Sequence, residues 1–299
     1  MIDERERRFG LITALSAFLF WGLAPIYFKW VDHVRADEII AHRIVWSVFF
    51  LGLILLLRDR GQVLKKIKIP PRMLAMLAVS STLILANWLI FVYAVNSDRV
   101  LSTSLGYFIN PLVNVVLGML IFRERLSPIQ ALAVLIAAAG TVYMALQVGE
   151  IPWVALSLAF SFGLYSVVRK LTDVGPMVGL FWETLLAIPL ALVWMVWLHR
   201  TGLLVFDPAQ VGSALLLIGT GLVTVIPLLL FAAAVRRLPL STMGIFQYLA
   251  PSMTFILAVF VYNEPFTVDH AITFGSIWLA LLLYTYPSLY RRRRAGATS

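Results

Sequence analysis

The apolar residues of this chain fall into successive runs that are each long enough to cross a lipid bilayer. Ten such runs can be placed, at residues 10–30, 38–57, 73–95, 101–122, 127–146, 151–168, 176–198, 211–235, 241–262 and 267–288. A transmembrane helix needs about 20 mostly apolar residues. Asp, Glu, Lys and Arg make up only 13% of the chain, whereas about a quarter of a soluble domain is charged. The sequence therefore predicts an all-α integral membrane protein of ten transmembrane helices.

Lysine and arginine are concentrated in alternate connections between these runs. With both termini in the cytoplasm, the cytoplasmic segments hold 19 basic residues and the outer segments four, while Arg43 lies inside a helix. Cytoplasmic loops of membrane proteins collect basic residues. This distribution predicts an even number of crossings and two cytoplasmic termini. The net charge of +9 therefore reflects orientation in the bilayer, and we expect no nucleic-acid partner.

The sequence lacks the usual signatures of redox, metal and enzyme sites. It has no cysteine and four scattered histidines, so disulfides, thiolate ligands and metal-ligand spacing are missing. It also has no HExxH, GxSxG, P-loop or dinucleotide-binding pattern. We expect no catalytic residues, no metal and no cofactor. Transport by such a chain would be secondary or passive, because an ATP site is missing.

The two halves of the chain resemble each other. A shift of 141 residues aligns Ala14, Leu15, Ser16, Gly22, Leu23 and Lys29 with Ala155, Leu156, Ser157, Gly163, Leu164 and Lys170, and a shift of 140 aligns Phe91, Ala94, Val95, Pro111 and Glu124 with Phe231, Ala234, Val235, Pro251 and Glu264. Residues 1–147 are predicted to form a first five-helix repeat, and residues 148–299 a second one with a basic cytoplasmic tail. Because five is odd, the second repeat is inverted in the membrane, which suits alternating access.

Polar residues line one face of several predicted helices. Steps of three or four residues align Ser104, Tyr107, Asn110, Asn114 and Gly118, then Thr220, Thr224 and Pro227, and then Gly244, Gln247, Pro251 and Thr254. Asn110 and Gln247 each lie near a repeat-related proline. One interpretation is that their amides line a central cavity and contact a substrate. The other is that they join neighbouring helices through hydrogen bonds worth about 0.6 kcal/mol each.

Aromatic residues also fall well inside the predicted helices, among them Trp21, Trp88, Tyr107, Tyr165 and Tyr248. Most aromatic residues in such positions pack against neighbouring helices. The three tyrosines are expected to lie deeper than the tyrosines that usually mark the membrane–water interface. Their depth would suit a cavity for an amphipathic solute.

Away from their ends, the predicted membrane-spanning runs contain three Asp, Glu, Lys, Arg or His side chains: His42, Arg43 and Glu183. Charges within a membrane are costly and mark functional sites by default. A shift of 141 residues aligns His42 with Glu183, so the two repeats would place one titratable group toward each side of the membrane. One interpretation is that these groups couple transport to protons.

A second interpretation makes the same residues structural. Arg43 would extend outward to Asp37 or Glu38, as long basic side chains near helix ends do. Glu183 would form a charge pair with the basic residues at 169–170. Nearby positive charge would keep the Glu183 carboxylate ionised and so weaken a role in proton transfer.

Several short motifs resemble the RarD-like branch of the EamA group in the drug/metabolite transporter superfamily. They are FWG at 20–22, YFK at 27–29, ADE at 36–38 with HR at 42–43, NW at 87–88, SLGYFINP at 104–111 and FQY at 246–248. The resemblance spans the chain and implies an inverted five-plus-five fold in a bacterial inner membrane. It also implies a cavity lined mainly by the first, third, fourth, sixth, eighth and ninth helices. The family often has an acidic residue where this chain has Ser102, so no coupling role carries over to that position.

The polar and aromatic patterns, taken with this resemblance, predict the substrate-binding residues Trp21, Asn87, Trp88, Tyr107, Asn110, Tyr165, Gln247 and Tyr248. The resemblance implies an exporter of a small amphipathic metabolite, such as an amino acid or a drug-like compound. Two alternatives stay open: a membrane protein that binds or senses a solute without moving it, and an intramembrane enzyme acting on lipid. The sequence leaves the substrate, the coupling ion and a homodimeric state undetermined.

Overall fold

The computed structural model describes residues 4–59, 69–123, 128–148, 151–172, 174–235, 237–238 and 246–296. These residues are almost entirely helical and contain no strand. The first half of the chain forms α1 (Glu4–Trp30), α2 (Ala36–Asp59), α4 (Pro71–Asn96), α5 (Val100–Phe122) and α6 (Pro128–Val148). The second half forms α7 (Trp153–Lys170), α8 (Pro176–Arg200), α9 (Val211–Val235), α11 (Leu249–Ile256), the π-helical turn η1 (Leu257–Val261) and α12 (Val268–Gly296).

Six of the described helices are long and apolar enough to span a membrane. The qualifying segments are Glu4–Trp30, Ala36–Leu57, Pro71–Asn96, Val100–Ile121, Met177–Arg200 and Val211–Phe231. Only helices and closed barrels satisfy every backbone N–H and C=O group inside hydrocarbon. The chain is therefore an all-helical, multi-pass integral membrane protein.

The ninth predicted helix, at residues 241–262, was wrong in part. Positions 241–245 lie outside the described residues. Phe246 is helical, Gln247 and Tyr248 form a turn, and α11 begins at Leu249. Pro251 has no N–H to donate to the Gln247 carbonyl, which weakens a helix at this turn, although its repeat mate Pro111 lies inside the continuous helix α5. The described part of the segment is a short helix followed by the π-helical turn η1.

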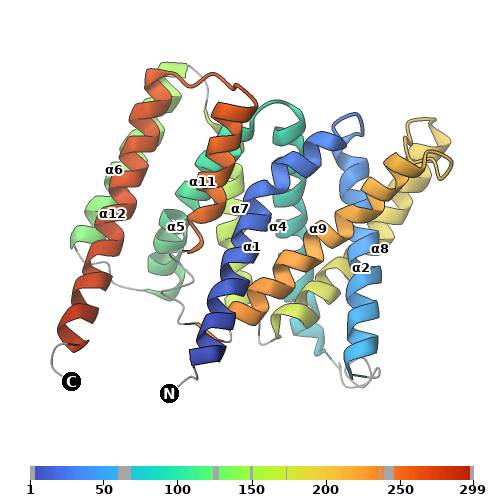
Figure 1. Cartoon of the computed structure of the whole chain (residues 1–299), viewed down its shortest axis with the longest axis horizontal. Helices are drawn as coiled ribbons and strands as arrows, with labels where there is room; N and C mark the ends of the chain where they lie inside the picture. The colour runs from blue at the N-terminus through green and yellow to red at the C-terminus, as the bar shows by residue number, and fades with distance from the viewer. Residues whose placement is uncertain are drawn as a thin grey trace.

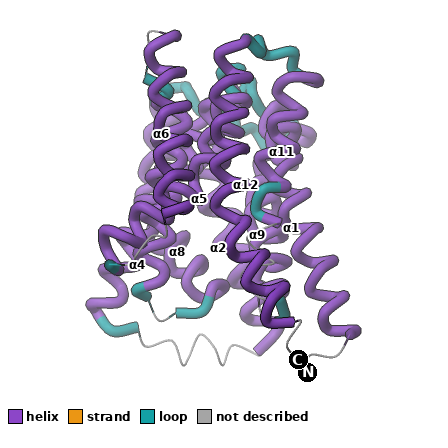
Figure 2. Tube along the Cα trace, turned by 90° about the vertical axis from the view of Figure 1, so that its left-hand side faces the viewer, coloured by secondary structure: helices purple, strands orange, loops and turns teal. Residues whose placement is uncertain are grey.

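Helices from the two halves of the chain interleave. The α1 and α2 helices both pack against α9, whereas α4 and α5 both pack against α7. Figure 1 shows α6 beside α12 at one end of the molecule and α2 beside α8 at the other end. The main hydrophobic core lies between these ends and includes the fully buried side chains of Phe28, Leu158 and Leu217. Figure 2 shows the same helices from the side.

Glu264 joins the connection before α12 to the beginning of α5. Its carboxylate accepts hydrogen bonds from the backbone N–H groups of Val100, at 2.6 Å, and Leu101, at 2.8 Å. Both N–H groups lie in the first turn of α5, where a helix has no internal acceptors and favours an anion. Burial raises the pKa of the Glu264 carboxyl above its ordinary value, while these two hydrogen bonds oppose the increase.

The contact between α5 and α7 depends on a glycine. A Cβ atom at Gly106 would lie 2.8 Å from the carbonyl oxygen of Ala155 and 3.1 Å from its Cα. Both atoms belong to the backbone of α7, so they cannot turn aside. Small residues at such positions let two membrane helices approach closely.

Gly106→Ala should therefore lower the stability of the protein, by about 1 to 3 kcal/mol if overpacking has its usual cost. The matched control is Gly275→Ala in α12, where an added Cβ meets nothing within 4 Å. Thermal unfolding in detergent, followed by size-exclusion chromatography, measures both variants. Equal melting temperatures for the two variants would contradict the close approach of α5 and α7.

Candidate functional site

Arg43 projects from α2 into the centre of the protein. Its side chain is 7% exposed, and its Nε–H donates to the Thr224 hydroxyl in α9 at 2.6 Å. The guanidinium carbon lies 4.0 Å from the ring centre of Trp88 and 5.6 Å from that of Phe28. A cation over an aromatic face is stabilised by the ring quadrupole. These contacts place Arg43 where α1, α2, α4 and α9 converge.

The predicted outward extension of Arg43 was wrong, because its supposed partners are engaged elsewhere. Asp37 pairs with Arg35 at 2.7 Å. The carboxylate of Glu38 accepts the backbone N–H groups of Val205, at 3.0 Å, and Phe206, at 2.8 Å. Arg43 also lies two helical turns into α2, where the indole ring of Trp88 stabilises the guanidinium in place of water.

Asn87 and Tyr107 are next to this cation. The Tyr107 hydroxyl donates to Asn87 Oδ1 at 3.2 Å, and Asn87 precedes Trp88, whose ring lies under the Arg43 guanidinium. The Asn87 amide nitrogen donates to the Leu158 carbonyl at 3.0 Å and to the Ser161 hydroxyl at 2.9 Å, both in α7. The predicted binding residues Asn87, Trp88 and Tyr107 are thus brought together around Arg43. We call these four residues the arginine cluster.

The arginine cluster has an aromatic side. The Tyr107 ring lies 6.0 Å from the ring of Phe91 and 6.3 Å from that of Phe162. Tyr107 is only partly buried. The cluster thus combines one cation, polar groups and ring surfaces.

Glu183 in α8 lies in a second buried polar group. One carboxylate oxygen accepts the Ser80 hydroxyl at 2.6 Å, and the other accepts the Tyr165 hydroxyl at 3.3 Å. Arg169 Nε lies 3.6 Å from Glu183 Oε1, and the Ser81 hydroxyl donates to the Glu183 backbone carbonyl at 2.6 Å. The charge pair expected between Glu183 and Arg169 is present. Tyr165 belongs to this acidic group and not to the arginine cluster.

His42 makes different contacts from its repeat mate Glu183. Its Nδ1 accepts the indole N–H of Trp46 at 3.3 Å, and its ring lies 4.6 Å from the ring of Phe206. Its Nε2 is 4.0 Å from a carboxylate oxygen of Glu38 and forms no hydrogen bond within the described part of the chain. His42 therefore packs against the connection before α9, and the structure does not bring it to Glu183.

Asn110 lies between α5 and α7. Its amide nitrogen donates to the Ala159 carbonyl at 3.0 Å, and its oxygen accepts the amide of Asn114 at 3.0 Å. The side chain is 1% exposed. These contacts are those of the interhelical interpretation, and the predicted contact of Asn110 with substrate stays a prediction.

The other three predicted binding residues lie outside the arginine cluster. Trp21 packs against Phe18 and Phe231, with ring centres 5.4 and 5.7 Å away, in a separate small apolar cluster. Gln247 and Tyr248 are half-buried in the turn before α11. Just beyond this turn, the Pro251 carbonyl accepts the Ser104 hydroxyl of α5 at 2.8 Å, which joins the two proline-containing segments.

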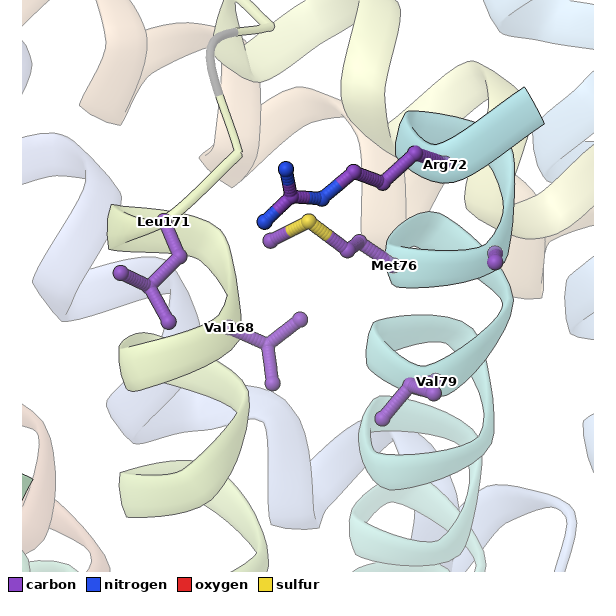
Figure 3. Close-up of a pocket in the computed structure, with 6 residues that line it drawn as sticks. Arg72, Met76, Val79, Val168 and Leu171 are labelled. Carbon is purple, nitrogen blue, oxygen red and sulfur yellow. The ribbon is translucent and has the colours of Figure 1, made fainter. Parts of the chain in front are cut away.

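A groove runs between α4 and the end of α7. It encloses about 390 Å³ and is lined by Arg72, Ala75, Met76, Val79, Val168 and Leu171. Figure 3 shows Arg72 and Met76 reaching from α4 toward α7. None of the predicted binding residues lines this groove. Its walls are mainly apolar, whereas the chemistry of the described residues is concentrated in the arginine cluster, so we place the candidate site there.

Sequence reasoning missed the partners of the two buried charges. Thr224 was assigned only to a polar stripe, and Ser80 was not singled out. A hydroxyl opposite a membrane-embedded charge is visible only once the helices are paired. The internal repeat could have indicated these hydroxyl groups, because a shift of 140 residues aligns Ser80 with Thr220, which lies one helical turn before Thr224.

Comparison with known proteins gives the family. The sequence profile of the EamA-like transporter family matches residues 8–146 and, separately, residues 151–286. Protein RarD of Escherichia coli strain K12 is 42% identical over 295 residues, which cover 99% of this chain and 100% of that protein. An uncharacterized transporter of Vibrio cholerae serotype O1 is 44% identical over 96% of this chain and 95% of its own length.

A solved crystal structure shares the fold. It matches with a TM-score of 0.61 at 18% sequence identity and covers 94% of this chain and 98% of its own. The family matches, the full-length relatives and the apolar helices agree with one another. The chain belongs to the EamA-like transporter family, in its RarD-like branch.

Proposed function

We propose that this protein is a secondary transporter that moves a small amphipathic metabolite out of the bacterial cytoplasm by alternating access. In this proposal ten helices span the inner membrane as two inverted five-helix repeats, and both termini lie in the cytoplasm. The observation that carries the proposal is the pattern of contacts between helices. When each helix is replaced by its counterpart in the other half of the chain, the main contacts are again pairs of helices that touch.

The exchange pairs α1 with α7, α2 with α8, α4 with α9, α5 with α11, and α6 with α12. Under this exchange the α5–α7 contact becomes α1–α11, and the α1–α9 contact becomes α4–α7. All four contacts are present. The α2–α8, α5–α11 and α6–α12 contacts map onto themselves and are also present. Such a pattern is expected of a pseudo-two-fold axis between inverted repeats.

The α2–α9 contact and its repeat mate, the α4–α8 contact, differ in extent. The α2 and α9 helices pack more extensively than α4 and α8 do. A Cβ atom at Gly221 of α9 would lie 2.6 Å from the backbone of Trp46 in α2. The corresponding residue of α4, Ser81, keeps a hydroxyl that reaches the Glu183 backbone. Under alternating access, the two contacts act as gates on opposite sides of the membrane. One gate is closely packed while the other is loosely packed, as α2–α9 and α4–α8 are here.

Each of these two contacts also pairs a membrane-embedded charge with a hydroxyl. Arg43 meets Thr224 between α2 and α9, and Glu183 meets Ser80 between α4 and α8. Under the proposal, both pairs are gate contacts that form and break during transport. Glu183 is then a structural partner of Arg169 rather than the carrier of a coupling proton.

Solute counterflow tests the proposed function. Purified protein in liposomes loaded with unlabelled phenylalanine, tryptophan or leucine should accumulate the matching labelled amino acid, because a carrier exchanges solute across the membrane without net flux. Liposomes without protein are the control. If amino acids raise the melting temperature of the protein but none is exchanged, the protein binds or senses solute and the transport proposal is wrong.

Arg169→Gln should destabilise the protein by about 3 kcal/mol, because it leaves the buried Glu183 carboxylate without its counter-ion. The double variant Arg169→Gln/Glu183→Gln should recover part of this loss. Arg35→Gln is the matched control, since its exposed pair with Asp37 contributes about 1 kcal/mol or less. Thermal unfolding measures all three.

The response of solute flux to a pH gradient provides a second test of the role of Glu183. Glu183→Gln should leave any response of flux to a pH gradient unchanged. Loss of that response, with solute exchange intact, would make Glu183 the proton carrier and would refute its structural role.

A further inference from the structure

Arg43 is a buried cation to which the described protein offers no carboxylate. The acidic residues of α2 are committed elsewhere, Asp37 to Arg35 and Glu38 to two backbone N–H groups. Within the described ranges, its polar contact is the Thr224 hydroxyl and its other contacts are aromatic rings. Arginine keeps its charge in proteins, and a buried charge needs a partner of opposite sign. The charge balance of this site therefore calls for an anion.

The geometry leaves one edge of the guanidinium free to bind that anion. The flat face stacks on Trp88 at 4.0 Å, and the Nε–H is used by Thr224. The two terminal nitrogens form no hydrogen bond to another described residue. Arg169 Nη1 is fully buried without a hydrogen-bond partner, whereas neither terminal nitrogen of Arg43 is among the described atoms in that state. Two parallel N–H groups at this edge match the two oxygens of a carboxylate.

The surroundings of that edge set the rest of the ligand. Trp88 and Tyr107 offer aromatic rings, and Tyr107 is only partly buried. A single arginine balances a single negative charge. A phosphate monoester carries roughly −1.5 to −2 charges at neutral pH, which this site would leave partly uncompensated. The arginine cluster therefore fits a small monocarboxylate with an apolar or aromatic body.

We propose that Arg43 binds the carboxylate of the transported solute, while Trp88 and Tyr107 contact its apolar part. This assignment rests on the proposed transport function and narrows its substrate to monocarboxylates. Because the Arg43 side chain also bonds Thr224 of α9, a bound carboxylate acts at the α2–α9 contact. Ligand binding and the closure of that gate then involve the same guanidinium.

The test compares acids with their neutral amides on the purified full-length protein. The probes are phenylacetate, indole-3-acetate, N-acetylphenylalanine and N-acetyltryptophan, each paired with its uncharged amide, and the readouts are thermal shift and tryptophan fluorescence. Loss of one partner of a buried charge pair weakens binding by about 30-fold or more. At least one acid should therefore bind about 30-fold more tightly than its amide. If no acid binds, or if acids and amides bind equally, the proposal is overturned.

Variants then assign the preference to Arg43. Arg43→Gln should remove the difference in affinity between acid and amide. Arg43→Lys should keep a weaker preference for the acid, because lysine retains the positive charge but lacks the two parallel N–H groups of the guanidinium. Arg35→Gln is the matched control and should bind like the wild type. A persistent acid preference in Arg43→Gln overturns the assignment. If that variant does not fold, Arg43→Lys provides the test. An acid preference equal to that of the wild type would then show that the two parallel N–H groups of the guanidinium do not bind the carboxylate, and it would overturn the assignment.

The two proposals fail in different ways. Acid-selective binding without counterflow would refute transport and leave the assignment of Arg43 standing. Counterflow of a solute whose amide competes equally well would support transport and refute Arg43 as a carboxylate site.

Discussion

Two charges buried among membrane-spanning helices, Arg43 and Glu183, are the constraint on which the rest of this structure depends. Hydrocarbon offers neither water nor counter-ions, so each charge has to be compensated by the protein or by a ligand. Glu183 is compensated within the described protein by Arg169 and two hydroxyl groups. Arg43 is held by Thr224 and by aromatic faces. This difference separates a structural charge from one available to a solute.

Under the proposed inverted repeats, the two charges lie at related helix contacts. The contacts that hold Arg43 and Glu183 lie at exchangeable helix pairs, α2–α9 and α4–α8. In the sequence repeat Glu183 is aligned with His42, and Arg43 is the next residue along α2. Under the proposed transport function, an anionic solute would bind at the α2–α9 contact, because Arg43 has no carboxylate partner among the described residues. It would not bind at the α4–α8 contact, where Arg169 compensates Glu183.

Much of the fold could be predicted from the sequence, because a bilayer forces apolar runs into helices. The observed bounds of α5, α8 and α9 fall within two residues of the predicted ones. The α1 helix begins six residues before its predicted start, and a turn at Gln247 and Tyr248 interrupts the ninth predicted helix before α11. The candidate site was less accessible to sequence reasoning. Asn87, Trp88 and Tyr107 were named, yet one of the two interpretations of Arg43 had its side chain extend outward. The indole and the hydroxyl that hold Arg43 lie on other helices, so the sequence alone could not pair them with it.

The central claim is that the α2–α9 and α4–α8 contacts open and close in opposition. Spin-label distances test it most directly, and the natural chain has no cysteine to remove. Labels at Arg72 and Met177 report on α4 and α8, and labels at their repeat mates Gly212 and Ala36 report on α9 and α2. Changing the solute concentration should lengthen one distance and shorten the other. Two distances that change together, or do not change at all when solute is bound, would contradict alternating access.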